Sequence, residues 1–245
     1  MSTKPLARQV MPGRSDAESA DASDGAVRPR DSLFHWCGTV DAIRSTRSPE
    51  DKQRLLDAYF AVVAEETVEP AARFFTGRLV STDPSIRIAE SVVGVAIQEV
   101  GRIGPEDFRA RCVGNGDLGE VAAEVFAGRL PSGLPMSEVG AWANDLGMSL
   151  GTRAEREPIT DMLGHLSSLE ARYVVQLLIG KLDSGLEAAD VERAVAFRRS
   201  QPESQRAPDR RRPESESETF EGQTRRRSRY APRFGVRLRT TTRIA

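Results

Sequence analysis

The sequence predicts an all-α protein, and three observations favour this fold class. Apolar residues recur every three or four positions over stretches of ten or more residues, which is the spacing of one face of a helix. Capping residues and prolines precede several of these stretches, and glycines follow them. No segment alternates apolar and polar residues for long enough to predict a strand.

The expected helices lie one after another between residues 33 and 199, and we expect eight or nine of them in this interval. The first clear one follows Ser48 and Pro49, which provide an N-cap and a first-turn proline. Another is expected to begin at Pro158, because an interior proline would break a helix that started earlier. The stretches with helical periodicity are residues 50–66, 86–101, 117–128, 137–147, 158–166, 167–180 and 187–199.

Two pairs of residues have the spacing of a capping box, in which side chains at the helix start satisfy free N–H groups. They are Asp117 with Glu120 and Ser167 with Glu170. The second pair opens the segment SSLEARYVVQLLIGKLDSGL, whose apolar residues form a broad face. Gly180 predicts the end of this helix.

The two ends of the chain differ in composition from this body. Residues 1–32 contain no sustained apolar run, so we expect a disordered leader there, and residues 200–245 predict a disordered, Arg-rich tail. Residues 198–245 carry 14 arginines and 6 acidic residues, a net charge of +8, which leaves −9 for residues 1–197. The sequence shows no secretory h-region and no apolar stretch of about 18 residues, so we expect a cytoplasmic protein.

The last part of the tail is the most basic segment of the chain. Residues 222–245 contain 8 arginines and no acidic residue. Such a run can bind nucleic acid by counterion release, with Arg225, Arg226 and Arg227 as candidate contacts. A tail without a partner and the product of a damaged reading frame are the alternatives.

Several short motifs occur in a fixed order along the body. They are GRLV near residue 78, GNGDLGEVA from residue 114, SSLEARYVVQLLIGKLDSGL from residue 167 and VERAVA from residue 191. This order resembles the N-terminal DNA-binding domain of ATP-dependent DNA ligases, over residues 33–197. The resemblance implies a single all-helical domain at residues 33–199 that grips duplex DNA on its minor-groove side around a nick, while separate domains perform the chemistry.

The resemblance and the physics of helix ends together indicate a binding loop after the helix 167–180. Gly180 and Gly185 would let the backbone approach a phosphate so that its N–H groups can donate, and Lys181 would add a positive charge. The alternative is a Schellman-type C-cap in which Lys181 only complements the helix dipole.

A second candidate element is the helix start at GDLG. Gly116, Leu118 and Gly119 could bring the backbone close to a phosphate at a positively polarised helix end, whereas the carboxylate of Asp117 is expected to act as a structural cap. Arg172 is either a DNA contact or an ion-paired surface residue.

Arg153 lies where the ligase family tends to carry basic residues, but nearby positions depart from the family pattern. Glu157 and Pro158 stand where the pattern usually shows Lys or Arg, and Asp183 replaces a basic residue after GKL. Each acidic replacement removes a phosphate contact and adds repulsion. We therefore expect weak, salt-sensitive binding to duplex or nicked DNA.

Ligation requires a lysine in a Lys-x-Asp-Gly motif, and none of the three lysines of this sequence stands in one. Lys181 heads Lys-Leu-Asp-Ser-Gly, which has one residue too many. We therefore expect no catalytic residue, no metal site and no cofactor in this chain, with ATP and Mg²⁺ needed only by a separately encoded catalytic partner. The expected role is non-catalytic DNA binding in repair, recombination or replication. The alternatives are a helical protein-interaction module, and the DNA-binding half of a split or truncated ligase.

Overall fold

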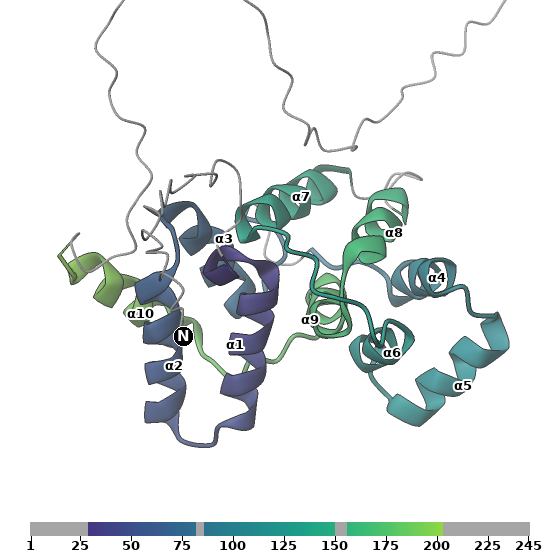
Figure 1. The fold of residues 1–245 in the computed structure, drawn as a ribbon, viewed down its shortest axis with the longest axis horizontal. Coiled ribbons are helices and arrows are strands. Elements are labelled where there is room, and N and C mark those ends of the chain that lie inside the picture. The colour runs from purple at the N-terminus through teal and green to yellow at the C-terminus, as the bar shows by residue number, and fades with distance from the viewer. Residues whose placement is uncertain (1–28, 82–85, 150–155, 203–245) are drawn as a thin grey trace, which may run out of the picture.

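The computed structural model describes residues 29–81, 86–149 and 156–202, and this part of the chain is all-helical, as the sequence predicts. A 3-10 turn at Pro29–Asp31 leads into ten α-helices within these ranges (Figure 1). No helix within these ranges is long and apolar enough to cross a membrane. The helices are α1 (Leu33–Ser45), α2 (Pro49–Val62), α3 (Glu65–Phe75), α4 (Glu90–Gly101), α5 (Pro105–Asn115), α6 (Leu118–Val125), α7 (Met136–Ser149), α8 (Arg156–His165), α9 (Ser168–Leu178) and α10 (Ala188–Ser200).

Helix α9 is the centre of the fold, as its broad apolar face predicts. It packs against α1 on one side and α6 on the other (Figure 1). Eight of its residues are buried, and the ring of Tyr173 meets that of Trp36 on α1 edge to face. Trp36 also contacts the rings of Phe74 and Phe75 on α3, so one aromatic cluster joins α1, α3 and α9.

The predicted caps form at the expected places. Ser48 accepts the N–H of Asp51 at the start of α2. The carboxylate of Glu170 accepts the N–H and the hydroxyl of Ser167, and it also accepts the N–H of Ser132, 38 residues away. Glu170 is fully buried, so this carboxylate fastens the loop before α7 to the start of α9.

The expected helix over residues 50–66 is in fact two helices, α2 and α3. Val63 and Ala64 are extended between them. The N–H of Ala64 donates to the buried carboxylate of Asp31 at 2.7 Å, which holds the break in place. This interaction also places Asp31 and the N-cap Ser32 in the packed part of the chain, although the sequence assigned them to the leader.

Helix α8 begins at Arg156, two residues before the predicted start at Pro158. A proline is tolerated in the first turn because the N–H groups there have no partner within the helix. The domain limits at residues 32 and 199 stay predictions, since most of both flanking segments lies outside the described residues.

Candidate nucleic-acid interface

Three turns that are distant in sequence lie on one side of the molecule. The α1–α2 and α5–α6 turns both lie along the lower edge of Figure 1, and the segment joining α9 to α10 passes behind α1, above the first of these turns. We call this surface the turn face. It comprises residues 44–52, 116–118 and 180–187.

Side-chain hydrogen bonds tie the three turns together. The side chain of Gln176 on α9 accepts from Arg44 at 3.2 Å and donates to Asp117 at 3.0 Å, and so connects the first two turns. Lys52 on α2 donates from its Nζ to the carbonyl of Gly185 at 3.1 Å. The candidate loop after α9 is therefore held beside the end of α1 and the start of α2.

The end of α9 has the geometry of a Schellman motif. Gly180 adopts a φ of +68°, its N–H donates to Leu177 O, and the N–H of Lys181 donates to Gln176 O at 2.8 Å. The C-cap alternative thus describes the geometry, and these two N–H groups are engaged within the protein. Gly180 is also half-buried, and a side chain there would overlap that of Arg87.

Gly185 is exposed, with a φ of +67°, but its N–H is engaged as well. It donates to the carboxylate of Asp183 at 2.9 Å, in a turn that the Asp side chain closes. The N–H groups of Leu182 and Asp183 find no acceptor among the described residues. The N–H of the buried Ser184 finds none among these residues either. The free main-chain donors on the surface of this loop therefore belong to Leu182 and Asp183 rather than to its glycines.

Lys181 is exposed and lies 2.6 Å from a carboxylate oxygen of Glu90 on α4. This hydrogen bond and the charge of Glu90 raise the pKa of Lys181, so the ammonium stays protonated at neutral pH. Both side chains are 56% exposed, and an ion pair so open to water contributes little to stability. The ammonium can therefore exchange this carboxylate for another anion at small cost to the fold.

The start of α6 combines an open turn with a tightly packed helix. Gly116 is exposed with a φ of +69°, and Asp117 caps the N–H of Glu120, as the sequence predicts. The N–H of the half-buried Leu118 has no acceptor among the described residues. Gly119 is buried, and a Cβ there would lie 2.6 Å from the carbonyl oxygen of Arg172. Gly119 therefore allows close packing of α6 on α9.

Arg172 is an ion-paired, partly buried residue on α9. Its guanidinium lies 2.8 Å from Glu120 on α6 and 3.5 Å from Asp41 on α1, and the side chain is only 29% exposed. Tyr173 also donates to Asp41, and burial together with this carboxylate raises the pKa of Tyr173 to about 12. Arg172 thus joins α1 and α6 to α9, with two carboxylates opposing its charge.

The remaining predicted contacts, Arg153, Arg225, Arg226 and Arg227, lie outside the described residues. The turn face also contains three basic residues that the sequence analysis did not name as candidate DNA contacts. They are Arg44, Arg47 and Lys52. Their sequence signal is weak, because single basic residues near helix ends are common on solvated surfaces.

Comparison with known proteins agrees with this architecture. The sequence profile described as DNA ligase N terminus matches residues 32–196. The chain belongs to this DNA ligase N-terminal family. The described helices that form the turn face all begin within the matched region.

Two relatives are described as probable DNA ligases. The protein of Opitutus terrae is 24% identical over 229 residues, which cover 77% of this chain and 22% of the relative. The protein of Koribacter versatilis is 26% identical over 165 residues, which cover 64% of this chain and 28% of the relative. The chain thus spans about a quarter of the length of these two relatives.

Proposed function

We propose that this ligase N-terminal domain binds duplex or nicked DNA through the turn face, mainly by contacts to the sugar-phosphate backbone. The carrying observation is that the turn face brings exposed glycine turns and basic side chains of separate helices onto one surface. Gly116 and Gly185 present no side chain to an approaching strand, and Lys181 and Lys52 lie beside the second of these turns.

The chemistry of these groups favours phosphate over base recognition. Lysine and arginine side chains and main-chain N–H groups contact phosphate oxygens, and such contacts carry little sequence information. The free N–H groups of Leu118 and Leu182 add neutral donors at the turns. We therefore expect binding without strong sequence preference that weakens as salt rises.

The internal pairing of several cations supports weak binding. Lys181 faces Glu90, and Arg172 faces Asp41 and Glu120. A phosphate must displace or tolerate these carboxylates, so the affinity per basic residue is reduced. Asp183 adds a further negative charge within the loop.

We also propose that the bound domain serves strand joining by ligase catalytic domains, in repair, recombination or replication. DNA binding itself would need neither ATP nor Mg²⁺. The support is the family membership and the probable ligases that share this region. Addition of EDTA or ATP is expected to leave the dissociation constant for a nicked duplex unchanged.

The test is fluorescence anisotropy of a labelled nicked duplex at low salt with the full chain. Lys181→Glu is expected to weaken binding several-fold, because it removes one phosphate contact and adds a repulsion. Arg156→Glu is the matched control, since it makes the same charge change at the start of α8, away from the turns of the turn face (Figure 1). Equal effects of both substitutions would place the binding surface elsewhere.

Two further measurements complete this test. Glutamine at Arg225, Arg226 and Arg227 together reports the contribution of the tail, which is expected to add affinity but not to replace the turn face. Two duplexes of unrelated sequence are expected to bind alike. If the full chain retains no duplex at low salt, DNA binding is wrong, and a helical protein-interaction module becomes the better interpretation.

A further inference from the structure

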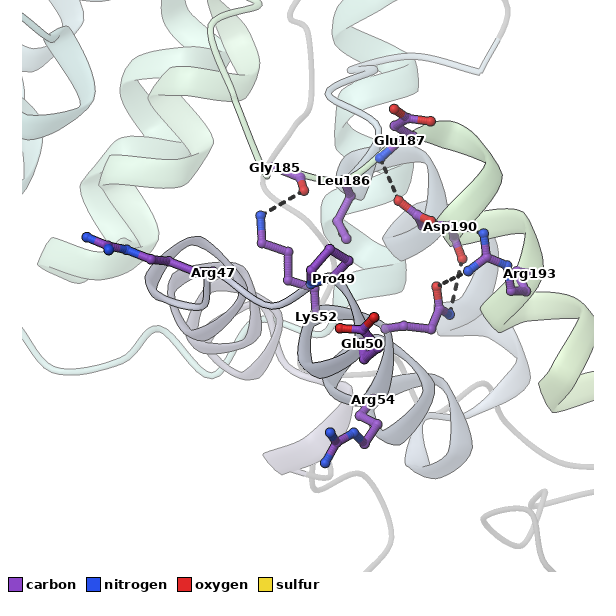
Figure 2. A pocket seen from close by; sticks show the side chains of 11 residues that line it. Arg47, Pro49, Glu50, Lys52, Arg54, Gly185, Leu186, Glu187, Asp190 and Arg193 are labelled. Carbon is purple, nitrogen blue, oxygen red and sulfur yellow. Dashed lines mark hydrogen bonds and ion pairs between the residues drawn. The ribbon is translucent and has the colours of Figure 1, made fainter.

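A hollow of about 660 Å³ lies on the turn face between the start of α2 and the first turn of α10. We call it the corner hollow. Figure 2 shows the Lys52 side chain extending from α2 toward the carbonyl of Gly185 at the edge of the hollow. The Arg47 side chain extends from the α1–α2 turn in a different direction, away from Gly185. Of the residues that line it, the sequence analysis named only Gly185 as a candidate DNA contact.

The basic residues of the corner hollow divide into two kinds. Arg54 and Arg193 are paired with acids of their own helices, at 2.6 Å from Asp51 and 3.1 Å from Asp190. Among the described residues, Lys52 has only the neutral carbonyl of Gly185 as its partner. The exposed Arg47 has no hydrogen bond or ion pair with any described residue.

This division matters for phosphate binding because a cation paired with a carboxylate must leave it, and the carboxylate that remains repels the incoming phosphate. Lys181 is of the paired kind, with Glu90 at 2.6 Å. A cation without an acidic partner has its full charge available to neutralise a phosphate. Its binding therefore releases the counterions that were condensed on the DNA at that phosphate.

We propose that Arg47 and Lys52 at the corner hollow are the principal phosphate contacts of this domain, ahead of Lys181 in the loop after α9. The inference rests on the proposed function and assigns where on the turn face the backbone is held. Because Lys52 and Arg47 point to different sides of the α1–α2 turn in Figure 2, they would contact different phosphates of one strand.

Besides Asp190, which is paired with Arg193, two carboxylates line the same hollow and limit its affinity. Glu50 accepts the hydroxyl of Ser48 at 2.9 Å, and hydrogen bonds from its own backbone N–H and from Ser48 lower its pKa, so it is ionised at neutral pH. Glu187 caps the first turn of α10, where the helix dipole favours its charge. Phosphates are therefore expected at Lys52 and at Arg47 rather than near these carboxylates, and Glu50→Gln is expected to tighten binding.

The experiment compares salt slopes of binding, that is, the change of log K with log salt, for a nicked duplex and the full chain. Arg47→Gln with Lys52→Gln is expected to reduce the slope by about 2, because each lost phosphate contact removes about 0.9. Lys181→Gln is expected to reduce it by clearly less than 1. Arg54→Gln with Arg193→Gln is the matched control, since it removes two paired cations from the same hollow and is expected to change the slope little.

The outcomes separate this inference from the proposed function. If the full chain binds and Lys181→Gln lowers the slope as much as the Arg47 and Lys52 pair does, the inference is wrong while DNA binding stands. The same holds if the Arg54 and Arg193 control lowers the slope equally. If the unsubstituted chain does not bind, the proposed function fails. For the variants, thermal melting checks that a loss of binding does not come from unfolding.

Discussion

The α5–α6 turn and the loop after α9 both carry two glycines around a helix end, and the structure uses Gly119 of the first and Gly185 of the second in opposite ways. At the first, Gly119 is buried against the backbone of α9, and Asp117 is bonded to both α6 and α9. At the second, Gly185 is exposed, and only the tip of the Lys52 side chain would meet an added Cβ. One glycine thus brings two helices together, and the other leaves a turn open to a ligand. Glycine spacing alone does not distinguish these roles.

The largest effect is expected for Gly119→Ala, because this glycine lies where α6 packs on α9. The new Cβ would lie 2.6 Å from the carbonyl oxygen of Arg172, a backbone atom that cannot move without shifting α9. Overpacking of this kind costs about 1–3 kcal/mol of unfolding free energy. Urea denaturation followed by circular dichroism measures the loss.

Gly114→Ala provides the matched control for that substitution. Gly114 lies in α5 with no atom near its added Cβ, so alanine there is expected to leave stability unchanged or raise it by about 0.5 kcal/mol through the lower entropy of the unfolded chain. If Gly119→Ala were as harmless as Gly114→Ala, the close packing of α6 on α9 would not be the reason for this glycine.

A smaller loss of unfolding free energy than that of Gly119→Ala is expected for substitution of Gly116. No atom lies near an added Cβ there, but φ is +69°. Gly116→Ala is expected to cost about 1–2 kcal/mol, because a side chain in left-handed backbone is strained. Gly116→Asn is expected to cost less, since asparagine tolerates this conformation. Equal losses for the two variants would show that the cost comes from side-chain contacts rather than from backbone strain.

The parts of the fold that the sequence predicts are those that local interactions determine. Asp117 caps a helix within one turn, Ser167 and Glu170 do the same, and Gly180 ends α9 through bonds to the preceding turn. Each of these signals spans at most about five residues, so sequence spacing alone reveals it. The start of α6 and both ends of α9 are accordingly predictable, whereas α6 ends at Val125, three residues before the expected end at Gly128.

The features that local spacing does not predict depend on contacts between distant segments. The break between α2 and α3 is held by Asp31, which lies 33 residues before Ala64. The charges of Arg172 and Lys181 are opposed by carboxylates on other helices, including Glu90 on α4. The sequence could nominate these residues for DNA contact, but only the folded chain shows which cations already have acidic partners.

The same reasoning gives the smallest prediction, at the open turn after α9. Asp183 has two effects there, because its carboxylate closes the turn by accepting the N–H of Gly185 and also repels any phosphate that approaches the free N–H of Leu182. Asp183→Asn keeps the acceptor oxygen but removes the charge. It is expected to tighten duplex binding about two- to threefold at low salt with an unchanged melting temperature, since an exposed charge near one phosphate contributes well under 1 kcal/mol. Asp183→Ala removes both the acceptor oxygen and the charge, so its gain in affinity is expected to be offset by a looser turn. A larger gain in affinity for alanine than for asparagine would mean that the turn geometry plays no part in binding.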